Sequence, residues 1–243
     1  MSSVADVCVA ACADAWRGDG EILASAFGSV PLIGARLARL TFEPELLLSD
    51  GEAFLLANVP ALSGAQEKIV EGWLPFASVF ELLAAGRRHV MMMPSQIDRS
   101  GNMNISCVGD WSKPTRQLIG SRGGPGNTVN HPTSYWVPNH STRSFVKHVD
   151  FVSGVGYDRP SGPFHEIRRV VTNLCVLDFE TPDHSMRLRS LHPGVTVEHV
   201  VESTGFSLTI PGDVPATRTP TDDEMRAIES LDPSNLRGTE VKV

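Results

Sequence analysis

Apolar residues recur along this chain with two spacings, and each spacing predicts one type of element. Apolar positions three and four residues apart predict helices over 4–16, 32–40, 77–85 and 197–203. Short apolar runs closed by turn residues predict strands over 22–27, 45–48, 89–93, 170–179, 186–191 and 206–210. The alternation of strands with helices favours an α/β fold.

Residues that start or stop helices stand at the ends of several of these segments. Gly18 and Gly20 follow the first predicted helix, and Gly86 follows the third, where glycine commonly caps a C-terminus. In the tail, Thr221 and Glu224 have the spacing of a capping box, in which each side chain accepts a backbone N–H of the other. We therefore expect one short helix in the tail.

Basic residues accompany two of the predicted helices. Arg36 and Arg39 lie on the polar face of the helix over 32–40. Arg87 and Arg88 follow the helix over 77–85, where their charge complements the negative end of the helix dipole. We interpret these four residues as the polar-face and dipole-compensating side chains of the two helices.

Length and composition are those of an ordinary globular protein. The 243 residues are 41% hydrophobic and 20% charged. We expect one domain over residues 1–212, built as an open mixed sheet flanked by helices, followed by a C-terminal extension over 213–243. The formal charge of −7 leaves no basic footprint, so nucleic acid is not an expected partner.

The sequence shows no sign of a membrane segment. No apolar run reaches the roughly 18 residues needed to span a bilayer. The N-terminus lacks the basic start of a signal peptide. We expect a cytoplasmic protein with no membrane partner.

Cysteines and histidines do not have the spacing of a metal site. No C-x-x-C pattern occurs, so we expect free, mostly buried thiols at Cys8, Cys12, Cys107 and Cys175. We expect hydrogen bonding in loops or surface positions for His131, His140 and His148. Neither a metal nor a cofactor is predicted.

The familiar catalytic signatures are absent from the sequence. It contains no nucleophile elbow, no Walker A motif, no H-E-x-x-H and no strict G-x-G-x-x-G. His165 and Glu166 are adjacent, and neighbouring side chains usually point apart, so a solvated pair is favoured over an acid–base pair.

Two polar stretches follow the predicted strand over 89–93. The first carries Gln96, Asp98, Asn102 and Asn104, and the second has four glycines within residues 120–126. In open α/β sheets ligands bind where strands end, and glycines let backbone N–H groups approach a ligand. Two interpretations stay open: a polar binding edge, and turns whose amides bond their own backbone.

An ordered series of motifs carries a resemblance to a known family. The motifs are PELLLSDG at 44–51, QID at 96–98, GNMN at 101–104, GSRGGPG at 120–126, FVKHVDF at 145–151, VVTNLCV at 170–176, PGVT at 193–196 and STGF at 203–206. In this order they resemble the beta subunit of class I coenzyme A transferases, especially the glutaconate-transferase branch. The resemblance covers roughly residues 5–210 and rests on the series, because no single motif is specific enough.

The resemblance implies that this chain has lost the family nucleophile. The family carries a glutamate in a Glu-x-Gly turn, and its carboxylate forms a covalent thioester with CoA. The matching residues are Ser49, Asp50 and Gly51, so the turn is kept and the carboxylate is not. Asp50 would face the other way on an extended chain, and Glu52 lies about 10 Å farther along it. Ser49 has no visible base to activate its hydroxyl.

A hydrolytic branch of the family matches this loss. That resemblance implies a heteromeric hydrolase that opens the last steroid-derived ring, a cyclohexenone carrying a CoA thioester, by adding water and cleaving a C–C bond. An alpha subunit in an α₂β₂ heterotetramer would supply the catalytic carboxylate, and no catalytic residue is expected in this chain. CoA enters as part of the substrate and not as a cofactor.

Matching the family motifs residue by residue implies a set of binding residues in this chain. Gly123 and Gly124 would form the oxyanion donor loop, with Asn102 or Asn104 beside the thioester. The full set implied for substrate binding and oxyanion donation is Ser49, Asp50, Gly51, Gln96, Asn102, Asn104, Gly123 and Gly124.

Two other functions stay open at this point. One is a CoA transferase whose nucleophile is displaced to Asp50 or Glu52. The other is a non-catalytic subunit that binds a CoA ester or serves as a scaffold.

Overall fold

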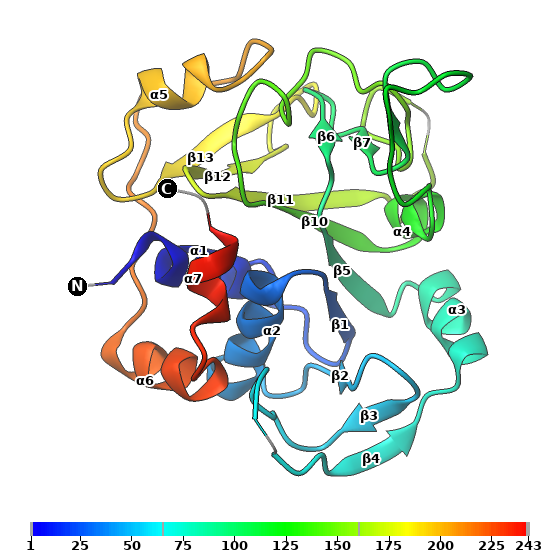
Figure 1. The fold of residues 1–243 in the computed structure, drawn as a ribbon, viewed down its shortest axis with the longest axis vertical. Coiled ribbons are helices and arrows are strands. Elements are labelled where there is room, and N and C mark those ends of the chain that lie inside the picture. The colour runs from blue at the N-terminus through cyan, green and yellow to red at the C-terminus, as the bar shows by residue number, and fades with distance from the viewer. Residues whose placement is uncertain (1, 65, 160, 242–243) are drawn as a thin grey trace. The chain divides into compact units, whose positions relative to one another are not determined.

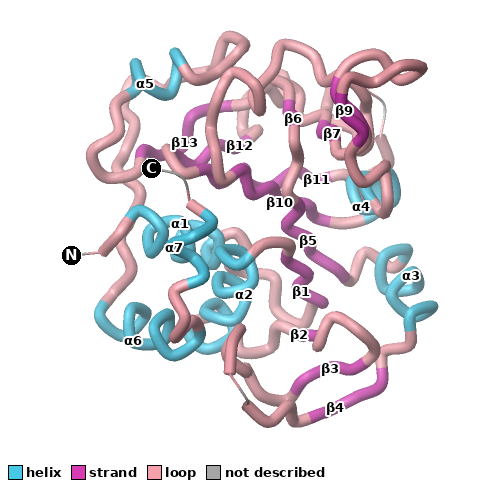
Figure 2. Tube along the Cα trace, in the orientation of Figure 1, coloured by secondary structure: helices cyan, strands magenta, loops and turns pink. Residues whose placement is uncertain are grey.

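The computed structural model describes residues 2–64, 66–159 and 161–241. The chain divides into two compact units: unit 1 comprises residues 1–91 and 218–243, and unit 2 comprises residues 92–217. Figure 1 labels the elements, and Figure 2 distinguishes helices from strands. The division differs from the expected boundary at residue 212, because the residues from Arg218 onward belong to the same unit as the N-terminal 91 residues.

Unit 1 contains both termini. Its helices are α1 (Val4–Asp14), α2 (Ser29–Thr41), α3 (Phe76–Ala84), α6 (Asp222–Leu231) and α7 (Leu236–Glu240). Its strands are β1 (Leu23–Ala26), β2 (Leu48–Ser49), β3 (Phe54–Leu56), β4 (Val70–Trp73) and β5 (Arg88–Met92), whose last residue lies beyond the boundary of the unit. Strands β1 and β5 are parallel, whereas β2, β3 and β4 form a separate antiparallel sheet.

Close approach of α1 and α2 builds the core of unit 1. Helix α1 begins with a capping box between Ser3 and Asp6, and most of its residues are buried. A Cβ on Gly34 of α2 would lie 2.9 Å from the Cβ of Cys12 in α1. Only glycine allows this contact without displacing a helix.

The C-terminal segment is an integral part of unit 1, and this corrects the expectation of an extension with one short helix. It forms two helices, α6 and α7, which contact α1 and α2. Arg218 donates to Asp14 at 2.6 Å, and Arg237 donates to Asp6 at 2.7 Å. The capping box at Thr221 and Glu224 is confirmed at the start of α6.

Unit 2 is built around a mixed sheet. Its strands are β6 (Gln96–Ile97), β7 (Met103–Asn104), β8 (Cys107–Val108), β9 (Arg116–Gln117), β10 (Pro132–Val137), β11 (Glu166–Thr172), β12 (Cys175–Asp178) and β13 (Arg187–Leu191). Its helices are α4 (Gly124–Asn130) and α5 (Val197–Glu202). Strands β10 and β11 are parallel, and β11, β12 and β13 run antiparallel in that order.

The α/β class and the helices over 4–16, 32–40, 77–85 and 197–203 are confirmed, but two predicted strands are wrong. Residues 170–179 form two antiparallel strands, because the Thr172 hydroxyl accepts the N–H groups of Leu174 and Cys175, each at 3.0 Å, and closes a turn. Residues 206–210 form only an isolated bridge, between Thr209 and Arg187. Strand β2 is shorter than predicted and begins at Leu48.

Several elements have no counterpart in the predicted pattern. These are the β3–β4 hairpin, β10, α4, α7 and the short strand pairs β6–β7 and β8–β9. All four cysteines are free and buried, as expected. Within the described ranges, no helix combines the length and apolar character needed to cross a membrane. The expected cytoplasmic location stays a prediction.

Candidate functional site

Unit 1 contains a cavity of about 540 Å³. Its wall is formed by β1, one face of α2, the turn after β2, the start of α3 and Arg88 of β5. The predicted residues Ser49, Asp50 and Gly51 all line it. A volume of this size falls in the range of small-molecule sites, so the cavity is a candidate binding site.

The turn after β2 depends on the Asp50 carboxylate. Its Oδ1 accepts the N–H groups of Glu52, Ala53 and Phe54 at 2.9–3.1 Å, and Gly51 adopts the left-handed φ of 85°. Partial burial raises the pKa of Asp50, but the three N–H donors and the charge of Lys68 outweigh it, so the pKa lies below its usual value. Asp50 is thus an ionised side chain engaged in holding its own turn.

Ser49 lacks the environment of an activated nucleophile. Its half-buried hydroxyl accepts the Gly51 N–H at 3.3 Å. The residues that line the cavity include no histidine. Serine needs an adjacent base to become a strong nucleophile, so the cavity wall of this chain does not activate Ser49.

Two arginines also line the cavity, and the sequence interpretation did not place them in the site. Arg36 projects from α2 and Arg88 begins β5. The Nε of Arg36 donates to the carbonyl of Pro60 at 3.0 Å, and the Nε of Arg88 donates to the Ser25 hydroxyl at 3.0 Å. Burial lowers the pKa of both guanidinium groups. The only sequence signal was their position: Arg36 in the helix over 32–40, and Arg88 directly before the strand over 89–93.

In unit 2, the side-chain amide of Asn104 forms its hydrogen bonds within the fold. It is fully buried, and its Nδ2 donates to Gln96 Oε1 at 2.7 Å and to the Cys107 carbonyl at 2.6 Å. Gln96 in turn donates from Nε2 to Asp150 at 2.9 Å. Both amide hydrogens of Asn104 are therefore used within the fold, which favours the turn interpretation for this residue.

Asn102 belongs to a second buried network. Its Nδ2 donates to Asp98 at 3.0 Å and to Asp158 at 2.9 Å, and its Oδ1 accepts the Gly156 N–H at 2.8 Å. Burial raises the pKa of Asp98 above its usual value, although N–H donors from Asn102 and Ser100 oppose the shift. A role of Gln96, Asn102 or Asn104 toward a thioester stays a prediction.

The glycine-rich stretch is not a loop throughout, because helix α4 begins at Gly124. The Gly124 N–H donates to the Ser121 carbonyl at 2.9 Å, so this donor is occupied. A Cβ at Gly124 would lie 2.6 Å from the Ser153 carbonyl oxygen and 2.7 Å from Met103 Cε. At exposed Gly123 the closest atom to such a Cβ is the side-chain amide of Asn127, at 3.3 Å.

Alanine at these two glycines is expected to have unequal effects. Gly124→Ala will destabilise the fold by about 2 kcal/mol because the methyl group meets backbone and a buried methionine. Gly123→Ala will change stability by less than about 0.5 kcal/mol, since Gly123 is exposed and its closest contact, at 3.3 Å, requires the Asn127 amide to shift by only a few tenths of an ångström. Urea unfolding of both variants measures the difference, and equal midpoints would contradict it.

The histidines do not form a metal centre. His140 is buried, stacks on Phe145 with ring centroids 3.8 Å apart, and bonds Thr172 and Thr204 at 3.2 and 3.0 Å. His131 is also buried and hydrogen-bonded, whereas His148 is exposed. Among the described residues, no group of three or more His, Cys, Asp or Glu side chains is placed to hold a metal ion.

His165 and Glu166 point to different partners, as expected. Glu166 pairs with Arg168 at 2.8 Å, and His165 bonds the Thr128 carbonyl and packs edge-on against Tyr157. Both residues are half-buried, so the pair is only partly solvated. The pair has no acid–base geometry.

The Coenzyme A transferase family matches residues 76–203, which is more than half of the chain. The chain belongs to the coenzyme A transferase family. This family member is 55% identical to the cholesterol ring-cleaving hydrolase IpdB subunit of Rhodococcus jostii, over 98% of this chain and 96% of that one. It is 54% identical, over the full length of both chains, to the subunit of the same name from Mycobacterium tuberculosis.

A solved structure agrees with the sequence comparison. The crystal structure of Rhodococcus jostii RHA1 IpdAB contains a chain that matches this coenzyme A transferase family member with a TM-score of 0.95 and 53% identity, over 100% of both chains. The family resemblance drawn from the ordered motifs is therefore confirmed, and so is the fold class.

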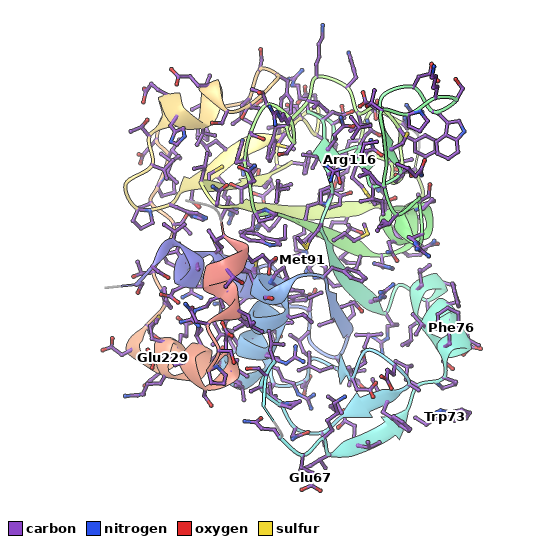
Figure 3. All side chains as sticks on the ribbon, in the orientation of Figure 1. Glu67, Trp73, Phe76, Met91, Arg116 and Glu229 are labelled. Atoms are coloured by element: carbon purple, nitrogen blue, oxygen red, sulfur yellow. The ribbon has the colours of Figure 1, made fainter. Side chains whose placement is uncertain are left out.

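One face of unit 1 is apolar and uncovered. Helix α3 has no buried residue, and its Phe76 and Phe80 are 75% and 56% exposed, with their rings edge to face at 5.2 Å. Trp73 of the edge strand β4 is 73% exposed, and Figure 3 shows Trp73 and Phe76 extending away from the ribbon. A nine-residue apolar helix is only marginally stable in water without packing. This exposed apolar face is therefore typical of a protein interface.

Proposed function

We propose that this chain is the beta subunit of a heteromeric hydrolase that opens the last steroid-derived ring, a cyclohexenone carrying a CoA thioester. Water adds to the enone, and a C–C bond of the adduct then breaks. The observation that carries the proposal is the identity of 54–55%, over 96–100% of both chains, to subunits of a cholesterol ring-cleaving hydrolase. The matching chain of IpdAB supports it at the level of the fold.

The cavity of unit 1 suits hydrolysis better than covalent transfer. By family resemblance, Ser49 stands where a transferase carries its nucleophilic glutamate. A carboxylate there would trap the thioester as a covalent adduct, whereas the half-buried serine hydroxyl leaves it open to water. Both stages of ring opening build negative charge on a carbonyl oxygen. Each fixed N–H donor that stabilises such a charge raises the reaction rate by a factor of about 100–1000.

The proton transfers are assigned to an alpha subunit in an α₂β₂ heterotetramer. Asp50 is ionised but committed to its turn, and the cavity lining offers no histidine. The two-subunit name IpdAB of the related structure supports a partner of this kind. Phe76 belongs both to the apolar face and to the cavity wall, so a subunit bound at that face would stand at the edge of the cavity.

The apolar face formed by Phe54, Ile69, Val70, Trp73, Phe76 and Phe80 is proposed as the contact surface for the alpha subunit. These six side chains are each 39–75% exposed. An aromatic side chain contributes about 150–250 Å² when buried, so the set supplies several hundred Å² of apolar area. That is the scale of the core of an interface burying about 800 Å² per partner.

The pair of subunits is required for turnover under this proposal. We expect ring-opened product when the chain is purified with its alpha subunit and incubated with the cyclohexenone-CoA, and none from either chain alone. Ser49→Ala is expected to keep turnover within about twofold of the wild-type pair, since the hydroxyl takes no part in the chemistry. Mass spectrometry of the CoA product measures both, and a pair that opens no ring would contradict the assignment.

A displaced-nucleophile transferase is the second candidate, because Asp50 and Glu52 both line the cavity. Hydroxylamine added together with an acyl-CoA attacks a thioester formed between an enzyme carboxylate and CoA, releases CoA and leaves a hydroxamate on that side chain. Modification of Asp50 or Glu52 in a catalytically active pair would favour transfer, and an unmodified chain would favour hydrolysis. Binding of the ester without turnover of any acyl-CoA would indicate a non-catalytic subunit.

A further inference from the structure

The start of helix α2 lies between two residues of the cavity wall. Phe27, two residues before the helix, and Leu32 in its first turn both line the cavity. Gly28, at the N-cap position, has a φ of 101°, a conformation that favours glycine. The usual N-cap residues, serine, threonine and aspartate, are therefore disfavoured at this position, and no side chain there caps the helix. The first N–H groups of α2 need an acceptor from elsewhere in the chain.

The carboxylate of Glu240 is that acceptor. Its Oε2 accepts the N–H of Ser29 at 2.5 Å and the N–H of Val30 at 3.2 Å. The next residue, Pro31, has no N–H, and Leu32 donates to the carbonyl of the N-cap residue at 3.1 Å. Glu240 thus satisfies the N–H groups that the helix itself leaves free, and its charge complements the positive end of the helix dipole.

The position of Glu240 is set by the contacts of α7. Glu240 is the last residue of this helix, which lies beside α2 (Figure 1). Arg237 of α7 is buried, and it donates to Asp6 of α1 at 2.7 Å and to Asp232 at 3.0 Å. A helix of five residues is not stable by itself, so these ion pairs fix where α7 lies and, with it, the carboxylate that caps α2.

We propose that Glu240 is a positioning residue for ring opening: by capping α2 from 211 positions away in sequence, it holds Phe27 and Leu32 in the wall of the substrate cavity. The inference rests on the proposed function for the substrate and adds a residue outside the cavity lining. Without the cap, the wall is correctly formed in only a fraction of the molecules. Apparent affinity for the substrate falls in proportion to that fraction, whereas turnover of the bound substrate is kept.

Glu240→Ala and Glu240→Gln in the assembled pair of subunits test the proposal. With the cyclohexenone-CoA as substrate, we expect the KM of Glu240→Ala to rise about fivefold, the usual size of the effect of losing a helix cap, and kcat to stay within about twofold. Glu240→Gln keeps a side-chain oxygen that can accept the same N–H groups, so its KM should stay within about twofold of the wild type. Amide hydrogen exchange of Ser29 and Val30 should be faster in Glu240→Ala than in Glu240→Gln or the wild type.

Glu229→Ala is the matched control. Glu229 is an exposed glutamate of α6 in the same C-terminal segment, outside the cavity lining (Figure 3). Its substitution should leave KM, kcat and the exchange of the Ser29 and Val30 amides unchanged. A fraction of unfolded protein in Glu240→Ala would lower the concentration of active sites, and therefore the apparent kcat, but it would not raise KM.

Three outcomes would overturn the inference. A Glu240→Ala pair with the wild-type KM would exclude a positioning role, and a lowered unfolding temperature would then mean that the cap only stabilises the fold. A raised KM without faster exchange of Ser29 and Val30 would exclude capping as its cause. A wild-type pair that opens no ring would overturn the proposed function and the role in the reaction together. Amide exchange distinguishes this last failure, because it reports the cap independently of activity.

Discussion

Replacing Phe76 and Phe80 together by aspartate is expected to prevent binding of the alpha subunit and so to abolish ring opening by the mixture. The two rings pack edge to face on α3 and are among the most exposed large apolar groups of unit 1. Two carboxylates at the centre of an apolar contact would be desolvated without partners, which costs several kcal/mol and lowers affinity by about a thousandfold. Analytical ultracentrifugation of the two chains together measures the loss directly.

The double variant should fold normally, because α3 has no buried residue and contributes little to the core. Circular dichroism and thermal unfolding of the isolated chain check this. Ile119→Asp serves as the control, since Ile119 is 64% exposed and belongs to unit 2, whereas the proposed face is made of residues of unit 1. It should assemble and turn over like the wild type. An intact heteromer formed by the double variant would refute the assignment of this face.

Lowering the pH from 7 to 5 is expected to destabilise the fold by about 4 kcal/mol through two buried histidines. Burial lowers the pKa of His140 to about 3, with a smaller contribution from the charge of His199. Burial also lowers the pKa of His192 to about 4, although its bond to the Thr172 carbonyl opposes the shift. Both residues are therefore neutral in the folded protein at pH 5.

The sign follows from the unfolded chain, in which each histidine has a pKa of about 6.5. Below that value the unfolded chain takes up protons that the folded protein does not, so stability is present above about pH 6.5 and is lost as the pH falls toward 4. Each group contributes about 1.4 kcal/mol per pH unit in this window. The carboxylates of Asp178 and Glu224, which pair with arginines, have lowered pKa values. Their contribution to the free energy of unfolding is therefore lost at still lower pH.

Urea unfolding at pH 7, 6 and 5 measures this dependence. His140→Gln and His192→Gln should each remove about half of the slope of unfolding free energy against pH, whatever they do to stability at pH 7. The slope is the informative quantity, because loss of the bonds to Thr172, Thr204 or Thr217 lowers stability at every pH. A wild-type slope that persists in both variants would assign the pH dependence to other groups.

Local features of the sequence were sufficient for the helices and for the family. Helices α1, α2, α3, α5 and α6 were predicted because apolar spacing and cap residues act over a few neighbours. The ordered motifs identified the coenzyme A transferase family because order along a chain is itself sequence information. The Ser49–Gly51 turn was located in the same way, and it lines the cavity.

Strand boundaries and the amide network depended on contacts that periodicity does not encode. Thr172 divides an apolar run into β11 and β12 through its hydroxyl, although the run has no glycine or proline. Asn102 and Asn104 have the same residue types that a ligand site would have. Their hydrogen bonds to Asp158 and Gln96, residues 56 and 8 positions away, commit them to the fold.

The sequence by itself determined the α/β class, the capped helices and the family, since all of these are read from adjacent residues or from their order. Only the tertiary structure brought Arg36 and Arg88, 52 positions apart in sequence, to one cavity wall, and placed the residues from Arg218 onward against α1. The physical reason is that such contacts are made by side chains whose partners lie far along the chain. Burial shifts the pKa of such side chains, and no local pattern of apolar residues records how deeply each side chain is buried.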